Sequence, residues 1–172
     1  MDDFYLDCDD IMATEKTVKC KANRALPRMG YLIGLSAQAE LPEHTVVEMP
    51  FWKAKHLSTG KHAPFSIILP GMYRPKFLNV ALAEPAVFPM TRALPQFYQL
   101  VIHMFPLFSD LSIDLRESIA RIYRGRVRMI AGYAYNDSSV LKPTHLDNWE
   151  TKMFQIGRNG HLALLSTCFV QF

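Results

Sequence analysis

The amino-acid sequence predicts an α+β fold that is mainly helical, with a small β-rich domain followed by an α-helical bundle domain. Of the 172 residues, 49% are hydrophobic and 20% are charged, which is typical of a folded chain. Strand-like runs lie only in the first part of the chain, and apolar residues at helical spacing dominate from residue 71 onward. We therefore divide the chain into residues 1–69 and residues 70–172.

Three short apolar runs favour β-structure in the first domain. They span residues 29–35, 45–49 and 65–69. A proline directly follows each of the last two runs and closes it, because proline has no amide proton for a strand ladder. Residues 51–57, between these two runs, are predicted to form two turns of helix.

The chain begins with an acidic stretch that holds five aspartates in its first ten residues. A calcium loop needs a glycine at its sixth position and a glutamate at its twelfth. A loop that started at Asp7 would have Met12 and Val18 there. We therefore expect a solvated acidic arm, which could still dock through the apolar residues interleaved with its acids.

Two helices are predicted between residue 70 and residue 106. The first carries apolar residues at helical spacing from Tyr73 to Leu82 and stops before Pro85. The second begins at Pro95, which suits the first turn of a helix, and stops at Pro106. Each helix is expected to end at its proline, Pro85 or Pro106, because proline cannot donate the backbone hydrogen bond that continues a helix.

Two longer helices are predicted in the rest of the chain. Asp114 and Glu117 have the spacing of an N-cap residue and its reciprocal partner, so the longest helix should begin there. We expect this helix to end at residues 136–137. Thr144 can cap a last helix, and Gly157 would supply the left-handed residue that ends it.

Four arginines of the longest predicted helix divide between its two faces. At about 100° per residue, Arg126 falls on the apolar face, whereas Arg121, Arg124 and Arg128 fall opposite. A charge that faces a core is costly unless it is paired, so we predict a specific partner for Arg126, in this chain or across an interface. The outer three are expected either to be solvated, with Glu117 one turn before Arg121, or to bind acidic proteins or phosphate backbone.

No catalytic or cofactor-binding motif is found in the sequence. Gly60 and Lys61 lack the first glycine and the Ser/Thr of a phosphate loop, and neither a G-x-S-x-G elbow nor a G-x-G-x-x-G fingerprint is present. The six histidines and three cysteines do not have metal-ligand spacing. We expect no catalytic residue, cofactor, metal site or membrane-spanning segment.

The aromatic content indicates a partner surface. The chain has eleven phenylalanines, seven tyrosines and two tryptophans, more large rings than a domain of this size is expected to bury completely. The net charge of +3 is too small to indicate nucleic acid by itself. We therefore expect exposed aromatic residues to contact other proteins, mostly between residues 97 and 154.

Several short motifs follow one another along the chain. They are Asp9-Asp10-Ile11, Leu26-Pro27-Arg28-Met29-Gly30, Val47-Glu48-Met49-Pro50-Phe51-Trp52-Lys53-Ala54, Ile122-Tyr123-Arg124-Gly125-Arg126-Val127-Arg128, Tyr133-Ala134-Tyr135-Asn136, Leu146-Asp147-Asn148-Trp149-Glu150 and Phe154-Gln155-Ile156-Gly157. In this order, over residues 4–162, they resemble subunit 3 of the GINS replication complex.

The sequence differs from the family pattern at its C-terminal end. Members of this family usually continue past the position of Gly160 with a polar tail, whereas residues 162–172 are mostly apolar. Such an end could be a lineage variant, the product of an alternative transcript end, or a packed strand-like tail.

The resemblance implies a non-enzymatic, nuclear protein that assembles with three sister subunits into a heterotetramer through helical domains. With the MCM hexamer and a RecJ-like partner, that tetramer forms the replicative helicase in initiation and elongation of DNA replication. The alternative is a nucleic-acid-binding module that uses the Arg121, Arg124 and Arg128 face. For the tetramer we expect at most weak or indirect contact with DNA and no membrane partner. The predicted subunit interface consists of Phe97, Tyr98, Tyr123, Arg124, Arg126, Arg128, Trp149 and Phe154.

Overall fold

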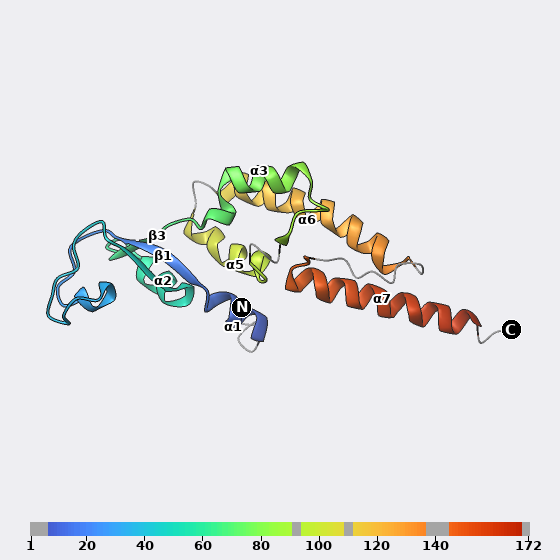
Figure 1. Cartoon of the computed structure of the whole chain (residues 1–172), viewed down its shortest axis with the longest axis horizontal. Coiled ribbons are helices and arrows are strands. Elements are labelled where there is room, and N and C mark those ends of the chain that lie inside the picture. The colour runs from blue at the N-terminus through green and yellow to red at the C-terminus, as the bar shows by residue number, and fades with distance from the viewer. Residues whose placement is uncertain (1–6, 91–93, 109–111, 137–144, 170–172) are drawn as a thin grey trace.

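The computed structural model of the chain describes residues 7–90, 94–108, 112–136 and 145–169 (Figure 1). A small antiparallel sheet lies toward one end of the elongated molecule, and the long helices lie toward the other. The predicted fold, α+β and mainly helical with the β-structure first, is therefore confirmed.

The sheet has three strands in the order β2-β1-β3. Its central strand β1 (Thr17–Ala22) pairs antiparallel with both β2 (Val46–Pro50) and β3 (Phe65–Ile67). Side chains of β1 alternate strictly between exposed and buried, as a strand with one solvated face requires. Strand β1 was not predicted. The runs over residues 45–49 and 65–69 are confirmed as β2 and β3, although β2 includes Pro50 and β3 ends at Ile67.

The run over residues 29–35, predicted to be β-structure, forms the short 3-10 helix η1 (Gly30–Ile33) instead. The N–H of Gly30 donates to the carbonyl of Ala39 at 2.9 Å, which folds the segment back on itself. Gly34 then ends η1 with a left-handed φ of 79°. The strand prediction was wrong because this local turn binds the backbone groups that a strand would use.

Helices next to the sheet connect it to the rest of the molecule. The predicted helix after β2 is confirmed as α2 (Phe51–Ser58). An unpredicted helix, α1 (Cys8–Thr14), precedes β1 and packs against α5. The sheet is thus covered by α2, which lies between β2 and β3 in sequence and contacts all three strands, while α1 connects β1 to the helical part (Figure 1).

The helical part begins with η2 (Gly71–Tyr73) and α3 (Pro75–Ala83), followed by α5 (Phe97–Met104) and η3 (Phe105–Leu107). Both helices that the prolines delimit are thus confirmed. The two long helices, α6 (Ser112–Ala134) and α7 (Asn148–Phe169), pack against each other.

Three predicted helix boundaries differ from the structure. Because α6 begins at Ser112, Asp114 lies in its first turn, where a negative charge favours the helix N-terminus, and is not its cap. The helix ends at Ala134, before the predicted residues 136–137. Gly157 does not end α7, because it lies where the two helices touch: a Cβ there would be 3.2 Å from the Cβ of Ala134. Thr144, the predicted cap of this helix, lies outside the described residues.

The apolar C-terminal segment is helical as far as Phe169, so the strand-like tail is wrong for the described residues. Its Leu-Ala-Leu-Leu sequence at residues 162–165 consists of strong helix formers. This end of α7 runs past the end of α6, and Leu162 and Leu164 are exposed (Figure 1).

One continuous hydrophobic core includes residues of the sheet, α2, α3, α5 and α6. Tyr73 illustrates the connection: its hydroxyl donates to the carbonyl of Phe97 at 2.8 Å, and the two rings lie 5.0 Å apart. This core fixes α5 in the middle of the molecule.

We predict that Gly30→Ala destabilises the protein, because the new Cβ would lie 2.6 Å from the Cβ of Ala39. Overpacking of this kind costs about 1–3 kcal/mol. As a control, Gly132→Ala places its Cβ in open space on α6 and should stabilise by about 0.5–1 kcal/mol. Thermal or urea denaturation of the purified variants measures both effects. A Gly30→Ala protein as stable as the wild type would contradict the packing described here.

Candidate functional site

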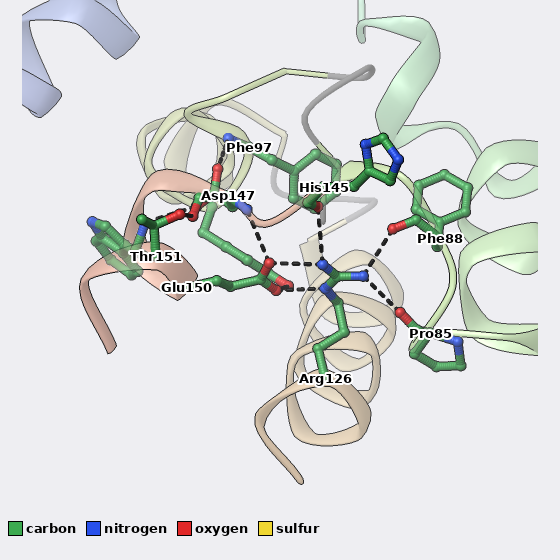
Figure 2. A network of polar contacts seen from close by, with 10 residues as sticks. Pro85, Phe88, Phe97, Arg126, His145, Asp147, Glu150 and Thr151 are labelled. Atoms are coloured by element: carbon green, nitrogen blue, oxygen red, sulfur yellow. Dashed lines mark hydrogen bonds and ion pairs between the residues drawn. The ribbon is translucent and has the colours of Figure 1, made fainter. Parts of the chain in front are cut away.

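Arg126, on the inner face of α6, is a fully buried charged residue whose guanidinium uses all five of its N–H groups. Nε and Nη2 donate to the two carboxylate oxygens of Glu150 at 2.6 and 2.8 Å. Nη1 donates to the carbonyls of Pro85 and Phe88, and Nη2 also donates to the carbonyl of His145 (Figure 2). The prediction of a specific partner for Arg126 is confirmed, and the partner is in the same chain.

Glu150 is as deeply buried as Arg126 and connects two more segments. Its Oε1 accepts a hydrogen bond from the Tyr98 hydroxyl at 2.9 Å, and its Oε2 accepts one from the backbone N–H of Asp147, also at 2.9 Å. Burial, together with the neighbouring Glu150 carboxylate, raises the pKa of Tyr98, so this hydroxyl stays protonated and can donate. Through Glu150, α5, α6 and the start of α7 are joined.

Asp147 is the cap of α7. Its Oδ2 accepts the N–H of Trp149, while the Glu150 side chain bonds back to the N–H of Asp147, which is the reciprocal pattern of a capping box. The other oxygen, Oδ1, accepts the N–H of Phe97 at 2.9 Å, so the same carboxyl also binds the first residue of α5 (Figure 2). Burial raises the pKa of Asp147 to about 7, although the bonds from Phe97 and Trp149 oppose this rise.

The N-terminal helix α1 is held by its acidic side. Asp10 Oδ1 lies 2.6 Å from Nε2 of His103 on α5. Asp9 pairs with Lys152 and accepts a 3.3 Å bond from the Asn148 side chain, both on α7. Within the described residues, the prediction of a solvated acidic arm is therefore wrong, because these carboxylates find cationic and amide partners on α5 and α7.

An apolar groove, which we call the α5 groove, runs beside α5 and has a volume of about 280 Å³. Its walls come from α5, η3, α6 and the first turn of α7, and Arg116 lies at one wall with its guanidinium 4.9 Å from the Phe105 ring centre. The main apolar wall residues are Tyr98, Ile102, Phe105, Ile119, Tyr123 and Trp149. A surface of this kind suits an apolar side chain of another molecule.

A smaller cavity of about 80 Å³, which we call the small pocket, adjoins the α5 groove. The two share Ile102 and Trp149. Asp10, His103 and Gln99 complete its lining. The surface that this pocket exposes is nevertheless almost entirely apolar, like that of the groove.

Neither a metal-ligand cluster nor a membrane span is found in the described part of the chain. There, no three histidine, cysteine, aspartate or glutamate side chains gather closely enough to hold a metal ion. Nor does any helix of the described segments combine the length and apolar character needed to cross a bilayer.

The residues predicted for a subunit interface fall into three groups. Phe97, Tyr98 and Arg126 are buried and hold this chain's own core together. Tyr123 and Trp149 line the α5 groove. The remaining three are Arg124 and Arg128, which are exposed on α6, and Phe154, which is half-buried on α7.

The other predictions for this part of α6 agree with the structure. Arg121, Arg124 and Arg128 are all on the exposed face, opposite Arg126. Arg121 donates to Glu117, one turn earlier, at 2.6 Å. One of the three outer arginines is thus already paired with a carboxylate of its own helix.

Glu150, Asp147 and Gln99 were not predicted as site residues. A signal existed for the first two, because Asp147-x-x-Glu150 has the same cap spacing as Asp114-x-x-Glu117. Nothing in the sequence spacing links Gln99 to a cavity, because that depends on how α1, α5 and α7 pack.

We predict that the free energy of unfolding falls as the pH rises from about 4 to about 7. The folded protein holds the proton of Asp147 up to about pH 7, whereas an unfolded aspartate loses it near 3.8. The protonated Asp147 therefore contributes its full stabilisation below pH 3.8, and this contribution is lost as the pH rises through 7. The free energy of unfolding falls by at most about 4 kcal/mol over this range. Asp147→Asn should flatten this slope in thermal denaturation at a series of pH values, and Asp114→Asn, on the exposed side of α6, should not. An unchanged slope in Asp147→Asn would refute the assignment.

Comparisons with known proteins agree with the motifs of the sequence. A family model described as the PSF3 N-terminal domain matches residues 6–59. The DNA replication complex GINS protein PSF3 of Pongo abelii is 30% identical over 164 residues, which cover 91% of this chain and 76% of the relative. The Homo sapiens protein of that name is 29% identical over the same shares, and that of Debaryomyces hansenii is 26% identical over 88% of this chain and 90% of its own length. The chain therefore belongs to the PSF3 family of DNA replication complex GINS proteins.

Proposed function

We propose that this chain is a non-enzymatic structural subunit of a GINS heterotetramer that acts in the nucleus, in initiation and elongation of chromosomal DNA replication. Its relatives carry the name of a DNA replication complex protein over most of the chain. In this proposal, residues 1–69 form a small β-rich domain and residues 70–172 form the helical, tetramer-forming domain. Three sister subunits are the direct partners.

The tetramer would work within the replicative helicase, together with the MCM hexamer and a RecJ-like partner. This finer assignment rests on the resemblance of the sequence motifs. Nothing in the geometry of the described residues calls for a catalytic role, since the titratable groups of the buried network are occupied with joining helices.

The observation that carries the proposal is the α5 groove. Trp149 and Tyr123 are large rings that are only half-buried there, and Ile102 is 47% exposed. Aromatic side chains in such positions contribute most of the binding energy when a partner covers them. We therefore assign the groove to a helix of a sister subunit.

The alternative function, nucleic-acid binding, rests on the exposed arginines of α6. Arg124 and Arg128 are one helical turn apart and both are exposed, which suits either phosphates or acidic side chains. Arg121 already pairs with Glu117, so part of the positive charge is neutralised within the helix. This pairing favours protein contact, with DNA contact at most weak or indirect.

We predict that the full-length chain assembles stably only when it is coexpressed with its three sister subunits, and that a photo-crosslinking amino acid at position 102 then captures one of them. The same group at Val80, which is 61% exposed on α3 and outside the groove, is the control. Mass spectrometry identifies the captured subunit. A monodisperse, stable monomer with no tendency to assemble would overturn the proposed function, and equal capture from positions 80 and 102 would overturn the assignment of the groove.

A further inference from the structure

We propose that the partner helix in the α5 groove carries a carboxylate beside its apolar anchor, and that this carboxylate pairs with Arg116. The inference rests on the proposed function and adds to it the chemistry of the partner. An aspartate or glutamate one or two helical turns from a large apolar residue fits this description. The ion pair would determine which helix enters the groove and in which direction it lies.

The α5 groove provides the space for the apolar anchor. Its volume of about 280 Å³ lies just below the range of about 300–1,000 Å³ in which pockets hold small molecules, so one or two side chains suit it better than a larger ligand. The groove is open to solvent, since Ile102 is 47% exposed and both Tyr123 and Trp149 are half-buried. An apolar side chain that enters the groove can therefore reach these walls.

Arg116 brings a positive charge to this apolar surface. Of the described residues that line the groove, it alone is charged. It is exposed on α6, and its guanidinium lies over the Phe105 ring, 4.9 Å from the ring centre. Contact with an aromatic face keeps the planar guanidinium in place, so less side-chain freedom is lost when it binds a partner. The charge is thus held at the groove wall before a partner arrives.

Within the described part of the chain, no carboxylate pairs with Arg116. The adjacent Glu117 pairs with Arg121 at 2.6 Å, and Glu150 is buried against Arg126. A guanidinium can form two parallel hydrogen bonds with one carboxylate, and such charge-assisted bonds are stronger than neutral ones. The complementary group for Arg116 is therefore a carboxylate of another molecule.

A protein helix fits this arrangement better than a nucleic-acid strand does. Nucleic acid needs several cations along its backbone, whereas the described lining of the groove has one cation beside apolar walls. The exposed arginines Arg124 and Arg128 do not line the groove. On a helix, residues three or four apart share a face, so an anchor and a carboxylate at this spacing can meet the groove and Arg116 together.

The chain offers a matched control in Lys53. This residue is exposed on α2 and lines neither the α5 groove nor the small pocket. Lys53→Glu makes the same change in net charge as Arg116→Glu. A difference between the two variants therefore reports on the groove and not on the total charge of the chain.

The experiment uses the full chain coexpressed with its three sister subunits, and it measures dissociation of the purified complex in a dilution series at low and high salt. We expect Arg116→Glu to weaken assembly about tenfold at low salt, because repulsion replaces attraction, and less at high salt, because an exposed pair is screened. Arg116→Gln should weaken it less, by about threefold. Lys53→Glu should assemble like the wild type. Amide hydrogen exchange of α6 in the assembled complex checks that the variants keep the fold.

The partner's sequence gives a second measurement. A photo-crosslinking amino acid at position 102 attaches the complex's own partner helix, and mass spectrometry sequences the attached peptide. We expect an aspartate or glutamate three, four or seven residues from the attachment point. Replacement of that acid by lysine should weaken assembly with the wild-type chain and restore assembly with Arg116→Glu.

Three results would each overturn this inference and leave the proposed function intact. They are assembly of Arg116→Glu equal to that of the wild type, equal weakening by Arg116→Glu and Lys53→Glu, and an attached helix without an acid at the stated spacing. A wild-type chain that does not assemble with the sister subunits overturns the proposed function itself.

Discussion

The ion pair between Arg126 and Glu150 determines how the helices of this protein are arranged. The guanidinium joins α6 to the start of α7 and also binds the carbonyls of Pro85 and Phe88, after α3. The carboxylate adds Tyr98 of α5. Removal of one member would leave the other buried and uncompensated, which typically costs about 3–5 kcal/mol. The position of α7 relative to α5 and α6 therefore depends on this pair.

The same hydrogen-bond network also positions two walls of the α5 groove. Trp149 is the residue directly before Glu150, and its N–H is bound by Asp147, so the cap of α7 fixes where this ring enters the α5 groove. Tyr98 contributes its hydroxyl to Glu150 and its ring to the groove wall. The core and the surface for a sister subunit are thus parts of one arrangement.

Local pattern predicted much of the fold, and its failures have physical causes. Helical periodicity placed Arg126 inward and Arg124 outward because a helix wheel needs only neighbouring residues. Glu150, the partner of Arg126, is 24 residues further along the chain, beyond the end of α6. No rule of helical spacing could therefore predict this pair. Two Asp-x-x-Glu sequences had the spacing of a cap, but only Asp147 forms one, because α7 begins directly after it whereas α6 already begins at Ser112, before Asp114. Gly157 was misread as a helix end since the close approach of Ala134 is a tertiary contact.

A double-mutant cycle on Arg126 and Glu150, each replaced by methionine, measures whether this buried pair holds the helices together, with Arg121 and Glu117 as the exposed control pair. Unfolding of the purified assembly is followed by thermal denaturation. We expect each buried single variant to be less stable than the double variant and the coupling to reach about 3 kcal/mol or more, because two methionines leave no buried charge unpaired. The control pair, whose side chains are more than half exposed, should couple by less than about 1 kcal/mol. Additive effects at Arg126 and Glu150, within about 0.5 kcal/mol, would contradict it.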